Sequence, residues 1–292
     1  MVVITQQEAA DRISPVFKGR LGKLLFHFAL WLTGIAKVNA LHDRVEQAGV
    51  PYGPPFAKAI LDDIGVDFRL GNAERLDHLP QGPFIVIANH FYGHIDGICL
   101  LDLFGERRPE TKVMVNEMLT WIPGLAPSFI AVNPATAASQ GVSDTSVNGV
   151  KSALLQLRDG GPLCLFPAGA VADLKPRERW TLSERDWLDA AVRLIRKARV
   201  PVVPVRFFDR NSRFYYTLGL LDYRVRFVRL FHEMFNKRGT CPRVGVGAPI
   251  SVEEQEQYTD LQAFKAFLRS SVYDMPLPER FATRSELWKS SK

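Results

Sequence analysis

Apolar residues along this chain follow two periodicities from about residue 84 onward. Short runs rich in isoleucine and valine have the length of buried strands. The stretches between them repeat their apolar residues every three or four positions, as one face of a helix does. Strands are expected at 84–88, 112–115, 129–132, 162–166, 200–208 and 243–246, and helices at 97–104, 144–158 and 184–197. This alternation predicts the α/β fold class, with a mixed, largely parallel sheet flanked by helices.

Residues 1–80 have a helical pattern instead. We expect an apolar helix near 17–38 and a second helix near 55–65. The most apolar part, 24–36, is about thirteen residues long, whereas a helix needs about twenty to cross a bilayer. Trp31 and the flanking lysine and arginine residues suit a lipid headgroup layer. The pattern therefore predicts an N-terminal helical membrane-docking region, with an ordinary buried helix as the alternative.

The change of pattern near residue 80 is the expected domain boundary. It divides the chain into the membrane-docking region at 1–80, an α/β domain at 81–255, and a C-terminal helix and tail at 256–292. The chain has 292 residues, of which 47% are hydrophobic, so a sizeable core can form. The tail beyond the last helix is polar, and its pattern assigns it no role.

Composition narrows the partners and the compartment. The net charge of +6 favours an anionic partner, such as anionic lipid, a phosphate-bearing cofactor, an acidic carrier protein or nucleic acid. No recognised nucleic-acid motif accompanies the charge, so we expect no nucleic acid. Cys99, Cys164 and Cys241 have unrelated spacings and form no disulfide framework or metal motif, which favours a reducing compartment. Two of these cysteines lie in apolar runs and are expected in the core. The sequence leaves the oligomeric state open.

The first candidate for chemistry follows the strand expected at 84–88. Asn89 and His90 lie at the carboxyl end of that strand, where open α/β sheets place their ligands. A loop containing Gly93 then brings Asp96 back toward the imidazole. A carboxylate bound to one ring nitrogen orients the other nitrogen outward as a base. No nucleophilic side chain accompanies the pair, so this base would deprotonate a hydroxyl or amine of the substrate.

Two other interpretations of the same residues stay open at this stage. His90 is a structural hydrogen-bonding residue in one of them, and Asp96 is the N-cap of the helix that follows. In the other, His94 joins His90 and Asp96 as a metal triad. A loop does not fix the geometry of such a triad, and no cysteine or acidic cluster completes the shell. We therefore expect no metal.

Two further strand ends carry candidate binding groups. The strand expected at 162–166 runs into a sharp turn of small residues, whose backbone N–H groups can approach a phosphate or an oxyanion. The simpler interpretation is a turn that ends the strand. The strand at 200–208 is followed by polar and basic residues. The residues of these two strand ends are Phe166, Pro167, Ala168, Gly169, Ala170, Arg206, Arg210 and Asn211.

Together, these motifs resemble the glycerophosphate/lysophospholipid acyltransferase superfamily, and within it the bacterial hemolysin-like branch. The resemblance covers about residues 55–252, and the order and spacing of the motifs make it specific. The motifs that carry it are Asn89-His90 with Asp96, Phe166-Pro167 with Gly169, and Val203-Pro204-Val205.

The resemblance implies an O-acyltransferase of phospholipid or lipid metabolism, peripheral at the cytoplasmic face of the inner membrane. It would move a fatty acyl group from acyl-coenzyme A or acyl carrier protein, as co-substrate, to a lysolipid hydroxyl. His90 would be the general base and Asp96 its orienting partner, without a covalent acyl-enzyme and without a resident cofactor. The implied substrate-binding residues are Asn89, Gly93, Asn133, Phe166, Pro167, Ala168, Gly169, Ala170, Arg206, Arg210 and Asn211.

Three departures from the superfamily pattern bear on the acceptor. Five residues separate His90 from Asp96 where the superfamily has four, and the glycine-containing insertion fits the hemolysin-like branch. Asn133 stands where an arginine grips the acceptor phosphate, which argues against a glycerol-phosphate acceptor. The expected acceptor is a lysophospholipid or an amino-acid lysolipid in place of lysophosphatidate. The usual glutamate of the third motif is replaced by Ala168 and Ala170, with Asp173 as a possible substitute. The alternative is therefore a catalytically impaired protein of the same fold that binds lipid or acyl thioester.

Overall fold

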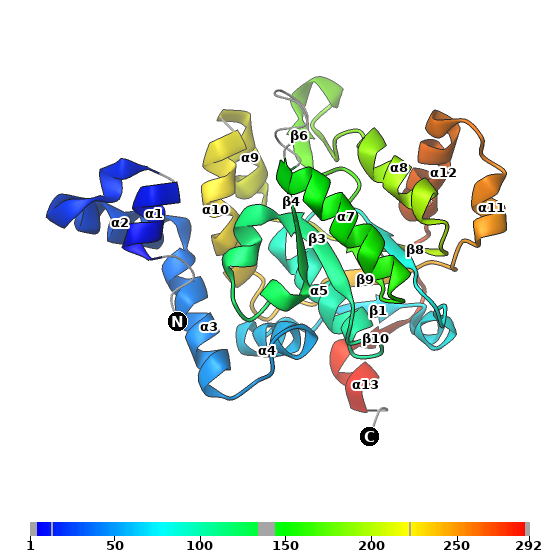
Figure 1. Ribbon diagram of the computed structural model, residues 1–292, viewed down its shortest axis with the longest axis horizontal. Coiled ribbons are helices and arrows are strands. Elements are labelled where there is room, and N and C mark those ends of the chain that lie inside the picture. The colour runs from blue at the N-terminus through cyan, green and yellow to red at the C-terminus, as the bar shows by residue number, and fades with distance from the viewer. Residues whose placement is uncertain (1–4, 13, 134–143, 222, 290–292) are drawn as a thin grey trace.

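The computed structural model describes residues 5–12, 14–133, 144–221 and 223–289, and within them eight strands form one sheet (Figure 1). The strands are β1 (Arg69–Gly71), β2 (Ile85–Ala88), β3 (Lys112–Asn116), β4 (Phe129–Val132), β5 (Leu163–Leu165), β8 (Val202–Phe207), β9 (Arg243–Val246) and β10 (Phe281–Thr283). Their spatial order is β10-β1-β9-β8-β2-β5-β3-β4. The β10–β1 and β9–β8 pairs are antiparallel, and the other pairs are parallel. The predicted mixed, largely parallel sheet is confirmed.

Helices cover both faces of this sheet. A short separate hairpin, β6 (Asp173–Lys175) with β7 (Thr181–Ser183), precedes α8. The helices are α1 (Gln6–Arg12), α2 (Gly19–Thr33), α3 (Ile35–Gln47), α4 (Pro54–Ile64), α5 (His94–Gly105), α7 (Asp144–Arg158), α8 (Asp189–Ala198), α9 (Arg213–Leu221), α10 (Tyr223–Phe235), α11 (Val252–Glu256), α12 (Leu261–Tyr273) and α13 (Arg284–Lys289).

The central strand β2 explains why its sequence is apolar without alternation. Val86 and Ala88 pack into a cluster with α4 and α5, whereas Ile85 and Ile87 pack into a second cluster with α7, α8 and α12. All four side chains are completely buried. A strand covered on both faces needs an apolar residue at every position, and this is what residues 85–88 supply.

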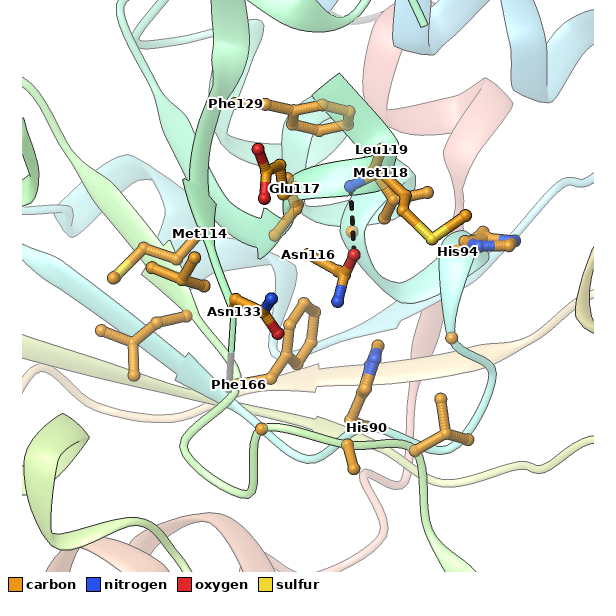
Figure 2. Close-up of a pocket in the computed structure, with 18 of the residues that line it drawn as sticks. His90, His94, Met114, Asn116, Glu117, Met118, Leu119, Phe129, Asn133 and Phe166 are labelled. Atoms are coloured by element: carbon orange, nitrogen blue, oxygen red, sulfur yellow. Dashed lines mark hydrogen bonds between the residues drawn. The ribbon is translucent and has the colours of Figure 1, made fainter. Parts of the chain in front are cut away.

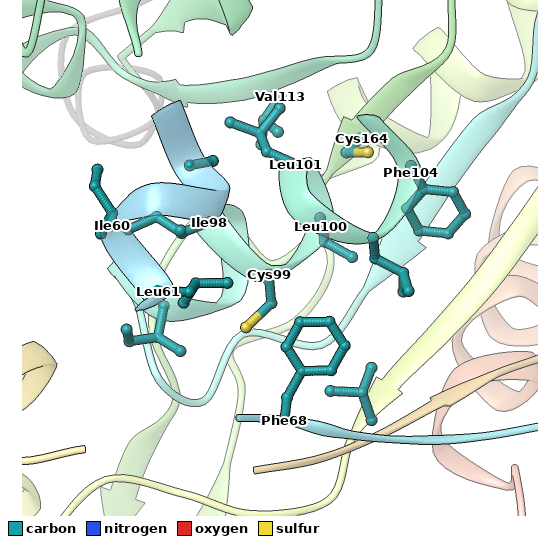
Figure 3. Close-up of a cluster of buried hydrophobic side chains, with 14 of the residues drawn as sticks. Ile60, Leu61, Phe68, Ile98, Cys99, Leu100, Leu101, Phe104, Val113 and Cys164 are labelled. Carbon is teal, nitrogen blue, oxygen red and sulfur yellow. The ribbon is translucent and has the colours of Figure 1, made fainter. Parts of the chain in front are cut away.

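The first of these clusters lies between α4, α5 and the sheet, as Figure 3 shows. Cys99 on α5 and Cys164 on β5 are both buried in it. Burial raises the pKa of both thiols above the ordinary value, because an apolar surrounding disfavours the thiolate. The prediction that these two cysteines are core residues is confirmed.

The single helix expected at 17–38 is wrong. Gly34 has a φ of 80°, which ends α2, and α3 begins at the next residue with its axis bent by 80°. The left-handed backbone conformation suits glycine because a side chain would be strained there. Within the described residues, no single helix has the length and apolar composition of a membrane span. The bent pair α2 and α3 passes that test together.

The helix expected at 184–197 begins later than the pattern predicted, because α8 starts at Asp189. Residues 184–188 leave the helix since their polar groups bond elsewhere. The backbone N–H of Leu188 donates to the carbonyl oxygen of Pro167 at 2.9 Å. The carboxylate of Glu184 is buried beneath the end of β2, as described below.

The C-terminal tail, to which the sequence pattern assigned no role, closes one edge of the sheet. Its strand β10 pairs with β1, so the sheet includes strands from each of the three predicted segments. Arg284 follows β10 and is buried, with its guanidinium bonded to the carboxylates of Asp102 at 2.6 Å and Asp62 at 2.6 Å. The buried ion pair ties the tail to α5 and α4. The division of the chain at residues 80 and 255 stays a prediction.

Candidate active site

Three strand ends meet at the centre of the sheet. β2 lies between β5 and β8, and all three strands are parallel, so their carboxyl ends share one edge. This edge brings together His90 after β2, the turn beginning at Phe166 after β5, and the residues that follow Phe207 in β8. The three candidate motifs of the sequence therefore belong to one region of the fold.

His90 and Asp96 form a hydrogen-bonded pair in this region. The Nδ1 atom of His90 lies 2.9 Å from Oδ2 of Asp96. The same carboxylate oxygen accepts the backbone N–H groups of Tyr92 at 2.9 Å and Gly93 at 3.1 Å. Because α5 begins at His94, Asp96 is in its first turn, and the expected N-cap position is instead occupied by Gly93. The short loop thus wraps around one carboxylate.

Gly93 makes this wrapped loop possible. Its φ is 79°, and a Cβ atom built on it would lie 2.8 Å from Cδ1 of Leu230 on α10. Both the backbone conformation and the close approach therefore favour glycine. The extra residue between His90 and Asp96 therefore allows the loop to turn sharply at Gly93.

Burial decides the electrostatics of the pair. Asp96 has no exposed surface, and this burial raises the pKa of its carboxyl, while the hydrogen bonds from His90, Tyr92 and Gly93 act in the opposite direction. With Asp96 as acceptor, neutral His90 carries its proton on Nδ1, which leaves Nε2 as a lone-pair base. The imidazole is 18% exposed and stacks on Phe166, with ring centroids 4.2 Å apart.

His94 takes no part in this pair. Its ring stacks on Phe231 of α10 with centroids 4.3 Å apart, and burial together with the nearby charge of His90 lowers its pKa to about 3. His94 is therefore neutral at ordinary pH. Among the described residues, the group that brings three metal-type ligand atoms within 4.8 Å of one another lies elsewhere, around His42 in α3. The metal-triad interpretation of His90, His94 and Asp96 thus gains no support from the geometry.

A cavity of about 1320 Å³ opens beside His90, and it is larger than the roughly 300–1,000 Å³ of ordinary small-molecule pockets. Its lining is mainly apolar. Figure 2 shows Met114 and His94 on opposite sides of the stacked pair His90 and Phe166, so the cavity extends from the pair in two directions. Such a space suits a long apolar chain whose reactive group lies at the imidazole.

Six of the predicted binding residues line this cavity. They come from the loop after β2, the end of β4, and the turn after β5: Gly93, Asn133, Phe166, Ala168, Gly169 and Ala170. Asn116, which the sequence did not single out, also lines it, and its Oδ1 accepts the backbone N–H of Met118 at 3.0 Å (Figure 2).

The other five predicted binding residues are not part of this lining, and four of them form hydrogen bonds within the protein. Asn89 is buried, and its amide both donates to and accepts from the backbone of Phe207, at 2.8 and 2.7 Å. This amide joins the ends of β2 and β8. The carbonyl of Pro167 accepts the N–H of Leu188. Arg206 donates to the carbonyl oxygen of Met275 at 2.7 Å, away from the cavity.

Arg210 and Asn211 lie at a second, polar hollow beyond Tyr92. Nδ2 of Asn211 donates to the carbonyl oxygen of Tyr92 at 3.2 Å, so this residue supports the loop that carries the His90–Asp96 pair. Asp173, the substitute considered for the missing glutamate of the turn, forms ion pairs with two arginines that line the cavity. It is bonded to Arg226 at 2.7 Å and Arg185 at 2.9 Å, and it is not part of the cavity lining.

Glu184 contacts the backbone of His90, and the sequence pattern did not predict this contact. Its carboxylate is buried and accepts three donors: the backbone N–H of His90, the hydroxyl of Tyr273 at 2.5 Å and the indole N–H of Trp187 at 3.3 Å. Burial raises the pKa of this carboxyl, although the three donors favour its charged form. Local sequence gives no signal for a contact between residues 94 positions apart, and the apolar periodicity assigned Glu184 to a helix.

A histidine hydrogen-bonded to a buried carboxylate, at the edge of a long apolar cavity, has the geometry of a general base for group transfer to a substrate hydroxyl or amine. Comparison with known proteins agrees. A model of the acyltransferase family matches residues 49–276, so the chain belongs to the acyltransferase family.

Two curated relatives are lyso-glycine lipid O-acyltransferases. The protein from Bacteroides thetaiotaomicron is 25% identical over 231 residues, which cover 73% of this chain and 81% of the relative. The protein from Phocaeicola vulgatus is 24% identical over 237 residues, which cover 75% of this chain and 81% of the relative.

The Asp96 contact predicts the tautomer of His90. In protein labelled with ¹⁵N in its imidazole rings, we expect the neutral His90 ring to carry its proton on Nδ1. Asp96→Ala should shift the ring toward the Nε2–H tautomer, because the acceptor for Nδ1–H is gone. His27, whose Nδ1 contacts a backbone carbonyl on α2, is the internal control and should not change. An unchanged His90 spectrum in the variant would contradict the assigned contact.

Proposed function

We propose that this protein is an O-acyltransferase that moves a fatty acyl group from an acyl thioester to the hydroxyl of a lysolipid. The observation that carries the proposal is the hydrogen-bonded pair of His90 and Asp96 at the edge of a large apolar cavity. A lyso-glycine lipid is the proposed acceptor. Both relatives bear that activity in their names. Asn133 also lines the cavity, and it stands where the superfamily pattern has an arginine that binds the acceptor phosphate.

The proposed reaction uses His90 first as a base and then as an acid. Nε2 takes the proton of the acceptor hydroxyl, and the oxygen attacks the carbonyl carbon of the thioester. The tetrahedral oxyanion then collapses, breaks the carbon–sulfur bond and releases the thiolate, which receives the proton back from the imidazolium. Asp96 stabilises the imidazolium between these steps. The acyl group passes directly to the acceptor, so the chain needs no nucleophile.

The turn after β5 is proposed to stabilise the oxyanion. Ala168 and Ala170 line the cavity, and their small side chains leave the backbone N–H groups accessible to a developing negative charge. Their lack of a carboxylate does not disturb the His90–Asp96 pair, whose hydrogen bonds come from other residues. This favours an active enzyme over the impaired binding protein. The conformation of Gly93 supports membership of the hemolysin-like branch, whose spacing it accommodates.

The test is thiol release from an acyl donor in the presence of lysolipids in detergent micelles. Acyl-coenzyme A and acyl carrier protein are each combined with lyso-glycine lipid, lysophosphatidate or lysophosphatidylcholine. We expect release that depends on the acceptor and is fastest with lyso-glycine lipid. His90→Ala should lower kcat by about 10²–10⁴-fold, the usual contribution of a general base. His78→Ala, at an exposed histidine, is the control and should keep full activity.

Full activity of a folded His90→Ala variant would contradict the proposed role of the pair. Tight binding of acyl thioester without turnover by the wild type, with either donor and every acceptor, would instead support the binding-protein alternative.

We also propose that the protein is peripheral at the cytoplasmic face of the inner membrane and docks through α2. Leu24 and Trp31 on this helix are each 68% exposed, and Leu21 and Phe28 are exposed beside them. Basic residues flank this apolar face at the start of the helix, including Lys23. An amphipathic helix of this kind binds anionic headgroups through its charges and the acyl boundary through its apolar side chains.

Docking through α2 predicts weaker vesicle binding when its apolar face is changed. We expect the double substitution Leu24→Ser and Trp31→Ser to lower partitioning into vesicles containing phosphatidylglycerol by about 10- to 100-fold, from the apolar surface no longer buried. Sedimentation with vesicles measures this. Leu277→Ser, at a leucine that is 52% exposed near the C-terminus, is the control. Equal binding by the wild type and the double variant would contradict docking through α2.

A further inference from the structure

The cavity beside His90 has two ends of different chemistry. One end lies under α3, α4 and α10, where Val38, Leu41, Ile60 and Met234 line it and all are buried. On the same side, a Cβ atom added to Gly97 of α5 would meet nothing within 4 Å, which leaves room beside the pair. The side chains named here are apolar and buried, so this end suits the far end of a hydrocarbon chain.

The other end lies between α7 and α8. Val150, Leu154, Ala191 and Leu194 continue the apolar lining there, and the exposed lysines Lys151 on α7 and Lys197 on α8 line the cavity beside them. In Figure 1, α2 lies at the left of the molecule and α8 at the upper right. This end therefore combines an apolar wall with two positive charges, away from the helix proposed to meet the membrane.

The two lysines have no acidic partner within the part of the chain that the structure describes. The acidic residue that lines this end, Asp186, is bonded to Lys265 at 2.8 Å. The other acidic residue of the lining, Glu117, faces Thr145 at the start of α7. The positive charges of Lys151 and Lys197 are thus available to a ligand.

We infer that Lys151 and Lys197 form the subsite for an anionic group of a substrate whose apolar part occupies the cavity. The inference rests on the proposed function. Two substrates of that reaction carry such a group: the phosphopantetheine phosphate of the acyl donor, and the carboxylate of a glycine lysolipid. A lysine that lines the cavity attracts either anion without requiring a fixed geometry, because an ammonium is a compact charge on a flexible stem.

The experiment compares charged substrates with neutral counterparts. The donors are acyl-coenzyme A and acyl-pantetheine, which lacks the phosphates, and the acceptors are lyso-glycine lipid and its carboxamide. We expect the double variant Lys151→Ala and Lys197→Ala to raise KM for one charged substrate about tenfold, with little change in kcat. The rise in KM should vanish when that substrate is replaced by its neutral counterpart. The substrate affected shows whether the lysines bind the donor phosphate or the acceptor carboxylate. Arg193→Ala, on the exposed face of α8 outside the cavity lining, is the control.

Unchanged KM for both charged substrates in the double variant, or an equal rise in Arg193→Ala, would overturn the subsite. Equilibrium binding of the same four ligands decides the question independently of turnover. A wild type that binds a charged ligand through the two lysines but shows no turnover would support the subsite and contradict the proposed function alone.

An independent observation concerns the backbone of His90. Glu184 accepts the N–H of this residue from below the end of β2, and the bond fixes the backbone from which the imidazole projects. Tyr273 and Trp187 hold the carboxylate in place from α12 and from the segment before α8. We propose that Glu184 is a positioning residue for His90. This too rests on the proposed function.

A positioning role predicts a loss of turnover without a loss of binding. Glu184→Ala should lower kcat by roughly 10- to 100-fold, with KM for both substrates nearly unchanged, because a displaced base costs rate. Glu184→Gln keeps an oxygen acceptor for the N–H and should recover part of kcat. Tyr273→Phe is the matched control, since it removes a different bond of the same carboxylate and should leave kcat nearly unchanged.

Thermal unfolding of each variant separates stability from positioning. A folded Glu184→Ala variant with unchanged kcat would overturn the proposal. So would a fall in kcat that is as large in Tyr273→Phe as in Glu184→Ala, because a merely structural network would lose activity with any of its bonds.

Discussion

The carboxylate of Asp96 is the constraint on which the rest of this site depends. A charge without exposed surface is costly unless several donors surround it, and the loop from His90 to Gly93 supplies them. Two backbone N–H groups and one imidazole N–H converge on one oxygen. That requirement fixes the conformation of the loop, the glycine at its end and the tautomer of the histidine. The orientation of the imidazole is therefore a consequence of how Oδ2 of a buried carboxylate is hydrogen-bonded.

The sheet places this loop where it can act. β2 is the central strand of a layered fold, and its apolar side chains are covered on both faces, so its end is held by close packing between β5 and β8. Asn89 joins β2 to β8, and Glu184 bonds the next residue from below. The cavity then extends to both sides of His90. Membership of the acyltransferase family accords with a hydrogen-bonded histidine at a strand end and a long apolar cavity beside it.

The sequence pattern predicted those features that depend on residues close together in the chain. The period of apolar residues predicted the mixed, largely parallel sheet, and the spacing of His90 and Asp96 predicted their contact, because both follow from a strand, a short loop and a helix. Contacts between distant segments were not accessible in this way. Asn89 seemed suited to bind substrate because it ends a strand, whereas its amide bonds the backbone of Phe207. Glu184 was assigned to a helix, since nothing near it in sequence indicates His90. The bend at Gly34 was missed because one glycine does not interrupt an apolar period.

The central claim is that His90 acts on the acceptor and never carries the acyl group itself. Rapid quenching of the wild-type enzyme during turnover, followed by mass spectrometry of the intact chain, tests this most directly. The account predicts an unmodified chain at every time point, with and without acceptor, while acylated lipid accumulates only when acceptor is present. A chain carrying one acyl group, formed with donor alone and discharged when acceptor is added, would contradict it.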